Sequence, residues 1–399
     1  MYYKYSILIP TFNRRKYLEK TLKTILDQNY INYELIVSDS GSSDDTWEYL
    51  KNLDYPNLKI IKPEKKLSEV ENFEFIINQA KGEWIIILGD DDGVLPNFFD
   101  GVDNIIKKYP EIEAISCKSG HYYHENIEDL YGDRVISFNY LSNKITKVNS
   151  KKSLLFCLLG IYTRADVPML YTSGIVKKSL VDKIKDKSQN KFFYSIIEDY
   201  YSMVAILFET SFYVSCQKPL FWIGTSKSSS GRGLRVYENN KDVDNYLKLS
   251  KNVSEKLHKA GIPSIYFLEA IFKHPYISYF WKSKIVSLIA YISAYQNIKN
   301  RNNTDTFKNK LTRKEILEEI SCEIKKKNIS KKIYFVFKFT LDILHHLINF
   351  YNLYKRFFYY FKKKIFKKSF FDINSNDRGK YSDLPNCNKI IEDFLKKNN

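Results

Sequence analysis

Three consecutive aspartates, Asp90, Asp91 and Asp92, are the residues of this sequence whose type and spacing most directly indicate chemistry. They follow the apolar residues 84–88, which predict a strand buried on both faces. Adjacent carboxylates repel one another unless a positive charge lies among them, and their oxygens suit a hard divalent cation such as Mg²⁺ or Mn²⁺. Such a cation also binds phosphate, so the motif indicates an enzyme that handles a nucleotide diphosphate. The alternative is a solvated loop that begins a turn at Asp92.

Alternating strand and helix patterns would position these acids. Apolar runs predict strands over residues 5–10, 33–37, 58–61, 84–88 and 114–117. Helical spacing of apolar residues predicts helices between them, over residues 15–28, 45–53, 69–80 and 96–109. This order predicts an α/β fold with a mostly parallel sheet flanked by helices. Ligands of such sheets bind beyond the carboxyl ends of the strands.

Three polar segments, residues 11–14, 39–44 and 90–92, each follow a predicted strand and should therefore share one edge of the sheet. The first strand is not followed by the Gly-x-Gly-x-x-Gly pattern of a dinucleotide site. The Gly-x-x-x-x-Gly-Lys-Ser/Thr pattern of a phosphate-binding P-loop is also missing from the sequence. The expected ligand site therefore differs from both of these nucleotide sites.

The rest of the sequence predicts a second region. Residues 169–176 suggest a strand interrupted at Gly174, residues 195–208 a helix, and residues 224–233 a flexible loop. We expect a domain boundary near Val236, with one domain at 1–236 and a mainly helical region at 237–399.

Composition limits the classes of protein that the chain can form. With 399 residues and 44% apolar content, it is long enough for one large or two ordinary domains. The five cysteines are scattered without a Cys-x-x-Cys spacing, which disfavours a zinc site or a disulfide framework and fits a reducing compartment. The start of the chain lacks the pattern of a secretory signal, and we find no uncharged apolar run of about 18 residues, so no transmembrane helix is expected.

Basic and aromatic residues are concentrated towards the C-terminus. The net charge is +17, and residues 355–368 contain seven Lys or Arg and no acid. Residues 332–371 interleave such cations with Phe, Tyr, Leu and Ile, which fits a helix lying in an anionic membrane interface. The alternatives are a helical bundle with a solvated basic face and, disfavoured by the lack of any nucleic-acid module motif, single-strand binding. An AT-rich genome is a further explanation of the lysine content.

Taken together, these segments resemble family 2 glycosyltransferases of the GT-A fold. The resemblance covers about residues 4–235, and its matching pieces are residues 7–14 (ILIPTFNR), Gln28, residues 34–44, Asn72, residues 80–84 and residues 88–92 with Pro96. It continues more weakly through Ser173, Gly174, Glu198 and Asp199.

The resemblance implies a nucleotide-sugar donor and assigns residues to it. The donor-binding set would be Pro10, Thr11, Asn13, Arg14, Asp39, Asp90 and Asp91. Asp39 would accept an N–H group of the base, although an aspartate there also caps its own turn. Asp91 and Asp92 would hold Mg²⁺ or Mn²⁺, which stabilises the leaving diphosphate.

Two departures from the family pattern concern the phosphates. Gly89 stands where many members have the first aspartate of the metal motif, and residues 69–71 lack the arginine that many members place there. The diphosphate charge would then be met by the metal, by Arg14, or by Lys227, Arg232 or Arg235. Acceptor or diphosphate contacts are further expected at Ser173, Gly174, Lys227 and Arg232.

Proton removal from the acceptor hydroxyl requires a base. Asp199 is the expected catalytic base and Glu198 the second candidate. The alternative is that both are acids of a helix N-terminus, capped by Ser195. A single base predicts inversion at the sugar carbon. His121 and His124 lack a partner cluster, and we interpret them as surface or loop histidines.

The resulting hypothesis is an inverting, metal-dependent glycosyltransferase of surface-polysaccharide biosynthesis, acting on a glycan or lipid-linked acceptor. We expect it in the cytoplasm, peripheral at the inner face of the bacterial cell membrane. The alternatives are a nucleotidyltransferase with the same metal site and a non-catalytic, membrane-bound protein of the same fold.

Overall fold

The computed structural model describes residues 3–124, 136–137, 143–162, 164–171, 173–194, 198–226, 229, 254, 256–257, 262–299 and 312–328, with scattered residues from 330 to 343 and from 385 to 392. The elements follow in the order β1 (Tyr5–Thr11), α1 (Arg15–Leu26), β2 (Tyr33–Asp39), α2 (Thr46–Lys51), β3 (Leu58–Ile61), α3 (Glu69–Ile77), β4 (Trp84–Ile87), β5 (Gly93–Val94), α4 (Phe98–Lys108), β6 (Ala114–Tyr123), β7 (Ile136–Ser137), β8 (Ile145–Asn149), α5 (Ser150–Leu158), the 3₁₀ turn η1 (Arg164–Asp166), β9 (Gly174–Lys177), α6 (Lys178–Lys187), α7 (Glu198–Glu209), β10 (Phe212–Thr225), α11 (Pro263–Lys273), α12 (Lys284–Lys299) and α13 (Arg313–Lys326).

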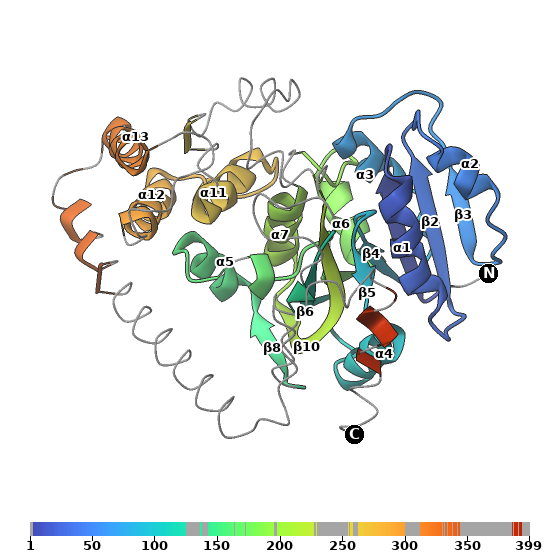
Figure 1. Ribbon diagram of the computed structural model, residues 1–399. Coiled ribbons are helices and arrows are strands. Elements are labelled where there is room, and N and C mark those ends of the chain that lie inside the picture. Colours follow the sequence, from blue (N-terminus) through green and yellow to red (C-terminus); the bar gives the residue numbers. More distant parts are fainter. Residues whose placement is uncertain are drawn as a thin grey trace.

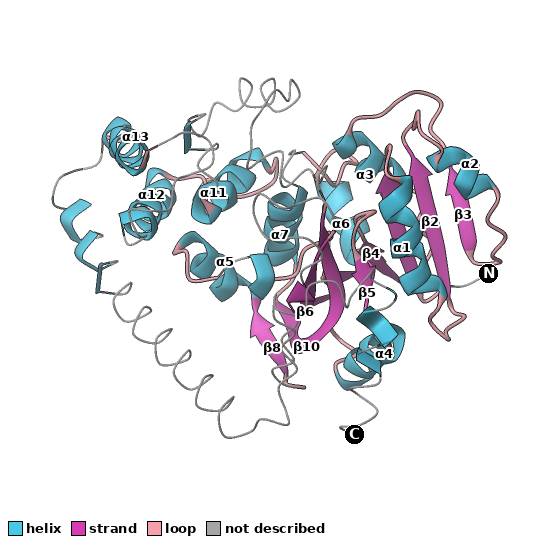
Figure 2. Cartoon of the chain, viewed as in Figure 1, coloured by secondary structure: helices cyan, strands magenta, loops and turns pink. Residues whose placement is uncertain are grey.

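A single twisted sheet runs through the centre of the molecule, in the strand order β3-β2-β1-β4-β9-β6-β10-β5 (Figures 1 and 2). Strands β1 to β4 pair in parallel, and β6 pairs in parallel with β10. The α/β fold class is confirmed. The structure adds antiparallel pairs beyond β4, because β9 runs opposite to both of its neighbours and β5 runs opposite to β10.

Side-chain alternation along the central strands divides the apolar core between the two faces of the sheet. In β1, Ile7 and Ile9 join the core beneath α1 and α4, whereas Leu8 joins the core beneath α3, α6 and α7. In β4, Trp84 and Ile86 face the first core, and Ile85 and Ile87 face the second. This alternation explains the continuous apolar run before the aspartates, since both faces of the strand are covered.

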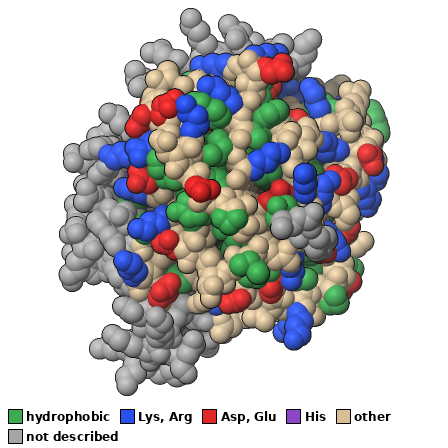
Figure 3. Space-filling view, turned by 90° about the vertical axis from the view of Figure 1, so that its right-hand side faces the viewer, with side chains coloured by type: hydrophobic (Ala, Val, Ile, Leu, Met, Phe, Trp, Pro, Cys, Tyr) green, Lys and Arg blue, Asp and Glu red, His purple; other side chains and the backbone are tan. Residues whose placement is uncertain are grey.

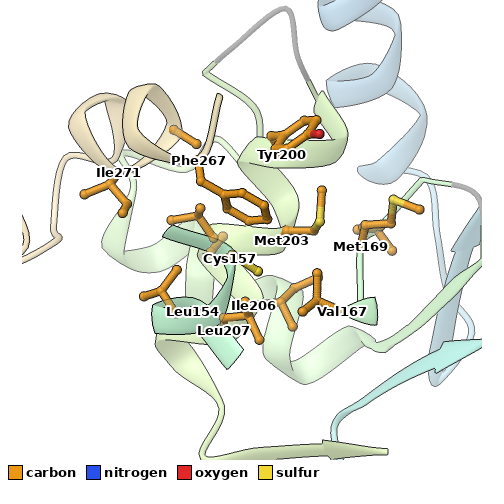
Figure 4. Packing of buried hydrophobic residues seen from close by; sticks show 14 of the residues in the cluster. Leu154, Cys157, Val167, Met169, Tyr200, Met203, Ile206, Leu207, Phe267 and Ile271 are labelled. Carbon is orange, nitrogen blue, oxygen red and sulfur yellow. The ribbon is translucent and has the colours of Figure 1, made fainter. Parts of the chain in front are cut away.

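The second core continues into the helical region. Phe267 and Ile271 of α11 pack with Leu154 and Cys157 of α5 and with Met203 of α7 (Figure 4). The predicted boundary near Val236 falls outside the described residues and stays a prediction, although one apolar cluster includes residues from both sides of it. Among the described residues, no helix combines the length and apolar character needed to cross a bilayer.

One predicted strand is shorter in the structure than the sequence indicates. The predicted strand over 169–176 is reduced to β9, because Ser173 takes a left-handed φ of 62° and breaks the extended chain. Gly174 then passes so close to Met169 that an added Cβ would lie 1.6 Å from its carbonyl oxygen. The predicted helix over 195–208 is described from Glu198, so its expected cap Ser195 lies outside the described residues.

The outer surface beside α2 and β3 mixes charges of both signs. Figure 3 shows basic, acidic and apolar side chains interspersed over this face, with no large area of one kind. The net positive charge of the chain therefore does not gather on this part of the described surface.

Candidate active site

The three predicted polar segments meet at one edge of the sheet. Thr11 ends β1 and lies in register with Asp39, which ends β2, while Leu8 is paired with Ile87 of β4. The acids that follow β4 therefore lie beside the end of β1. The hydroxyl of Thr11 donates to Asp90 Oδ2 over 2.7 Å, which ties the first and third segments together.

Arg14, just before α1, neutralises two of the aspartates. Its Nε lies 2.8 Å from Asp90 Oδ1, and its Nη2 lies 2.5 Å from Asp91 Oδ2. The side chains of Arg14, Asp90 and Asp91 are only 11%, 10% and 7% exposed. Burial works against the charge of Arg14, but the two carboxylates outweigh it and raise its pKa. A guanidinium thus supplies the positive charge that adjacent buried carboxylates require.

The two paired acids differ in their protonation. Burial raises the pKa of Asp90 to about 7, against the opposing effect of Arg14. Burial acts in the same direction on Asp91, but Arg14 and His124 outweigh it and lower its pKa. The two acids, which share one guanidinium, therefore have pKa values shifted in opposite directions.

Asp91 collects further polar contacts from distant parts of the chain. Its Oδ2 accepts hydrogen bonds from the hydroxyls of Ser226 and Ser229 over 2.7 and 2.6 Å. The ring nitrogen Nε2 of His124 lies 2.9 Å from the backbone oxygen of Asp91. His124 does lie in a loop, but its ring is buried rather than at the surface.

Asp92 differs from Asp90 and Asp91, because its carboxylate accepts hydrogen bonds from two backbone N–H groups of separate segments. Its Oδ1 accepts from the N–H of Gly224 over 2.8 Å, and its Oδ2 accepts from the N–H of Gly89 over 2.9 Å. At Gly224 an added Cβ would lie 1.6 Å from the backbone oxygen of Asp91, so only glycine fits there. At Gly89 a Cβ would meet Asp92 Oδ2 at 2.8 Å and the Tyr171 hydroxyl at 2.9 Å. The departure from the family motif at Gly89 thus has a steric reason.

Asp39 caps its own turn and keeps one carboxylate oxygen without a donor among the described groups. Its Oδ1 accepts from the backbone N–H and the hydroxyl of Ser42, over 2.9 and 2.6 Å, as a turn-capping aspartate does. Its Oδ2 is buried, and no described group donates a hydrogen bond to it. Asn13, with a left-handed φ of 56°, accepts from the N–H of Ser43 over 2.6 Å and fixes the same turn. A buried acceptor without a donor is costly unless a ligand supplies one.

Asp199 lies in the first turn of α7 and pairs with Arg164 of η1. The Arg164 Nη1 is 3.0 Å from Asp199 Oδ2, and the two side chains are 39% and 12% exposed. Burial opposes the charge of Arg164, but Asp199 outweighs it and raises the pKa of the arginine. Burial, followed by the charge of Glu69, raises the pKa of Glu198 well above its usual range. Burial thus favours the protonated form of Glu198 and makes it the weaker candidate for a proton acceptor.

Tyr171 connects the two acidic centres. Burial raises its pKa well above the usual range, and the charges of Asp92, Asp91, Glu69 and Asp90 raise it further. The same hydroxyl also contributes to the raised pKa values of Arg14 and of Arg164. One tyrosine is therefore within electrostatic reach of the aspartates after β4 and of the arginine that holds Asp199.

The oxygen atoms around Asp90 and Asp91 are of the kind that binds a hard cation. Among the described residues, no three His, Cys, Asp or Glu side chains are arranged as a ready-made metal site. However, carboxylate oxygens of Asp90 and Asp91 converge on one guanidinium, with hydroxyl groups beside them. Such oxygens fit Mg²⁺ or Mn²⁺, whereas both oxygens of Asp92 already accept backbone N–H groups.

The remaining predicted residues lie in different surroundings. Pro10 is in β1 next to Thr11, and Ser173 and Gly174 lie beside β6, where the Ser173 carbonyl accepts from the N–H of Cys117. Lys227 and Arg232 lie outside the described residues. Sequence analysis missed the residues that link distant segments, namely Arg164, Tyr171, Ser226 and Ser229. Only the glycine and serine content of residues 224–233 hinted at the last two.

Comparison with known proteins identifies the class. The profile of the family described as "Glycosyl transferase family 2" matches residues 6–158, which include β1 and the three aspartates. Residues 6–158 therefore form a family 2 glycosyltransferase domain, and the chain is an enzyme of glycosyl transfer.

Two relatives show the range of the resemblance. A Campylobacter jejuni protein, "GalNAc(5)-diNAcBac-PP-undecaprenol beta-1,3-glucosyltransferase", is 27% identical over 281 residues, which are 67% of this chain and 82% of that protein. A Methanococcus voltae protein, "Dolichyl N-acetyl-alpha-D-glucosaminyl phosphate 3-beta-D-2,3-diacetamido-2,3-dideoxy-beta-D-glucuronosyltransferase", is 33% identical over 120 residues, which are 28% of this chain and 37% of that protein. Among solved structures, "S. aureus TarS 1-349 in complex with UDP-GlcNAc" has 13% identity and a TM-score of 0.48, over 74% of this chain and 81% of that chain.

Proposed function

We propose that this glycosyltransferase moves a sugar, with inversion, from a nucleotide-diphosphate donor to a hydroxyl of a glycan or lipid-linked acceptor. The observation that carries the proposal is the presence of two acidic centres, Asp90 with Asp91 beside Arg14 at the carboxyl edge of the sheet, and Asp199 beside Arg164. The first centre suits a diphosphate and its cation, and the second suits a proton acceptor. The family assignment favours sugar transfer over nucleotidyl transfer and over a non-catalytic role.

The nucleotide would bind at the ends of β1 and β2. The unpaired Asp39 Oδ2 would accept an N–H of the base, while Pro10, Thr11 and Asn13 form the neighbouring wall. The buried position of Asp39 strengthens such a hydrogen bond, because water does not compete for it.

A divalent cation would be held mainly by Asp91, because both oxygens of Asp92 accept backbone N–H groups and both oxygens of Asp90 contact Arg14 or Thr11. The contacts of the Asp91 carboxylate described above use Oδ2 only. When bound, the cation supplies charge stabilisation of the leaving diphosphate, worth several kcal/mol. Arg14 lies between the two carboxylates and would carry part of the same charge. Asp199 would take the proton of the acceptor hydroxyl, oriented by its ion pair with Arg164. One base without a nucleophilic carboxylate gives single displacement.

The proposed acceptor class rests on the resemblance to the Campylobacter jejuni enzyme, whose printed name includes an undecaprenol-linked glycan. Membrane contact has its own support. In the described part of residues 332–343, Phe335, Val336, Phe339 and Ile343 are exposed, and Phe335 stacks on Phe339. An exposed apolar stripe flanked by lysines suits the inner face of an anionic membrane. The basic residues 355–368, expected to take part, lie outside the described residues.

The transfer reaction is tested with a panel of nucleotide sugars and Mn²⁺. A true donor should raise the melting temperature and should release a nucleoside diphosphate when acceptor is added. Asp91→Asn should lose turnover, whereas the matched control Asp182→Asn, an exposed acid of α6, should retain it. Full turnover in a chelator would contradict the metal assignment, and retention of configuration in the product, read by NMR, would contradict single displacement.

The membrane contact is tested by flotation with vesicles that contain phosphatidylglycerol. The variant Phe335→Ser/Phe339→Ser should bind these vesicles at least several-fold more weakly than the wild type. The control Tyr55→Ser, which removes an exposed aromatic side chain near α2, should bind normally. Equal flotation of all three proteins would remove this surface from the proposal.

A further inference from the structure

A short helical segment near residue 388 packs against the catalytic half of the molecule. Pro385, Cys387, Asn388 and Ile391 of this segment are buried, whereas Lys389 is exposed. In Figure 1 this segment, coloured red, lies beside α4, far from α13 in the helical region. Residues from near the C-terminus thus cover the side of the sheet that carries β5.

Asn388 makes two hydrogen bonds there with both ends of its amide. Its Oδ1 accepts from the indole Nε1 of Trp222 over 2.9 Å, and its Nδ2 donates to the backbone oxygen of Val94 over 3.0 Å. Asn388 is 8% exposed, and Trp222 and Val94 are fully buried. Both hydrogen bonds lie in the interior, so the loss of either one would leave a buried polar group without that partner.

The two strands that Asn388 joins are the ones that hold the aspartate loop. Val94 belongs to β5, a strand of two residues that begins directly after Asp92. Trp222 is paired with Gly93 across the β10·β5 ladder, two residues before Gly224. The N–H of Gly224 is the donor to Asp92 Oδ1. Along β5, only Gly93 separates Val94, which Asn388 contacts, from Asp92. Along β10, Trp222, which Asn388 also contacts, is two residues from Gly224, the donor to Asp92.

Such a short strand needs support from outside. The β5·β10 ladder contains only the pairs Val94 with Phe221 and Gly93 with Trp222. A two-residue ladder is weak by itself, and the adjoining loop brings three buried acids together, of which Arg14 pairs with two. The N–H of Leu95 also donates to the carbonyl oxygen of Leu220 over 2.9 Å, and Asn388 adds a link between the two strands through its side chain.

We propose that Asn388 is a positioning residue for the aspartate loop: its amide joins β5 to β10 and so holds Asp90, Asp91 and Asp92 in the arrangement that binds the donor diphosphate. The catalytic half is then complete only when the segment around Asn388 is docked. The consequence for turnover rests on the proposed function, whereas the ordering of the loop does not.

Hydrogen exchange of the full chain tests the inference without any substrate. In Asn388→Ala, the backbone amides of residues 89–96 and 220–226 should exchange about tenfold faster, the effect of one to two lost buried hydrogen bonds. Exchange in β1, β2 and α12 should stay unchanged. The control Lys389→Ala changes an exposed residue of the same segment and should leave all of these rates as they are.

A second variant keeps the test decisive if Asn388→Ala folds poorly. Trp222→Phe removes the indole N–H but keeps an aromatic ring in the core, so it should accelerate exchange in the same two stretches, and the double variant should add little to either single one. Unchanged exchange at 89–96 in the two single variants would overturn the inference, and so would an equal acceleration over the whole protein.

Turnover gives an independent measurement. Asn388→Ala should lower kcat for the nucleotide sugar about tenfold, with the KM for the acceptor unchanged. If the wild-type protein transfers no sugar, the proposed function fails while the exchange result still decides the role of Asn388. If the wild type is active and Asn388→Ala is equally active with normal exchange, only the inference fails.

Discussion

The candidate site contains two acid–arginine groups, and their arginines differ in how deeply they are buried. Arg14, with Asp90 and Asp91, lies at the carboxyl edge of the sheet, called the rim below, and these side chains are at most 11% exposed. Arg164, with Asp199, lies at the start of a helix, and its side chain is 39% exposed. The first group is also fastened by Thr11, Ser226 and Ser229, whereas the second depends on the ion pair and the first turn of α7.

This difference fits two different roles in the proposed reaction. A buried, fully bonded charge cluster is arranged before any ligand arrives and holds a fixed electrostatic field. Asp199 is itself only 12% exposed, and the part of the second pair that reaches solvent is Arg164. The first group therefore fits the proposed stabilisation of a leaving diphosphate, and the more open ion pair fits the proposed role of Asp199 as the base.

The sharpest way to break the comparison is to remove the proposed base. Asp199→Asn should lower kcat about 10²–10⁴-fold, while Glu198→Gln should lower it much less, because burial and the charge of Glu69 favour the protonated form of Glu198. The rates are measured by release of nucleoside diphosphate at saturating donor. A larger loss in Glu198→Gln than in Asp199→Asn would reverse the two roles.

Removal of one charge from the rim should have the next largest effect. Asp91→Asn should lower kcat about 10²-fold, the loss of a few kcal/mol of charge stabilisation, and should weaken the response to Mn²⁺. Asp92→Asn should instead mainly destabilise the fold, because an amide nitrogen would face a backbone N–H group. Melting curves and Mn²⁺ titrations separate the two variants. If both titrate Mn²⁺ like the wild type, neither side chain is a ligand.

The arginines should differ in their effect on stability. Arg14→Met leaves buried carboxylates without a counter-charge and should cost about 3–5 kcal/mol of unfolding free energy. Arg164→Met removes a partly exposed partner and should cost less than about 1 kcal/mol. Urea denaturation of both variants provides the measurement. Equal losses would show that the two pairs are buried to a similar effective depth.

The pH dependence of unfolding free energy should contain a contribution from a buried histidine as well as from these acids. Burial lowers the pKa of His274 to about 3, from an unfolded value of 6.5. As the pH falls below 6.5, the unfolded chain binds a proton that the folded protein does not, so stability is lost, by about 2 kcal/mol between pH 7 and pH 5. His274→Gln should remove that part of the slope in urea denaturation. An unchanged slope would assign the acid sensitivity to other groups.

Much of the site was predictable because its residues follow strands. Thr11, Asp39 and Asp90 each come directly after an apolar run, and parallel pairing brings strand ends together, as the bond from Thr11 to Asp90 confirms. The occupied oxygens of Asp92 were not predictable, because their donors, Gly89 and Gly224, are brought there by the close approach of the aspartate loop to β10. Arg164 and Tyr171 were missed for a similar reason, since no local periodicity marks a residue whose only signal is its partner in space.

The link through Asn388 has a consequence for biosynthesis. Val94 and Trp222 precede Asn388 by 294 and 166 positions, so their partner leaves the ribosome well after the sheet has begun to fold. A nascent chain can therefore bury its strands early and still lack the last contact of its aspartate loop. At about 5–20 residues per second, translation alone would postpone that contact by many seconds, which keeps an unfinished enzyme from meeting its donor in a working state.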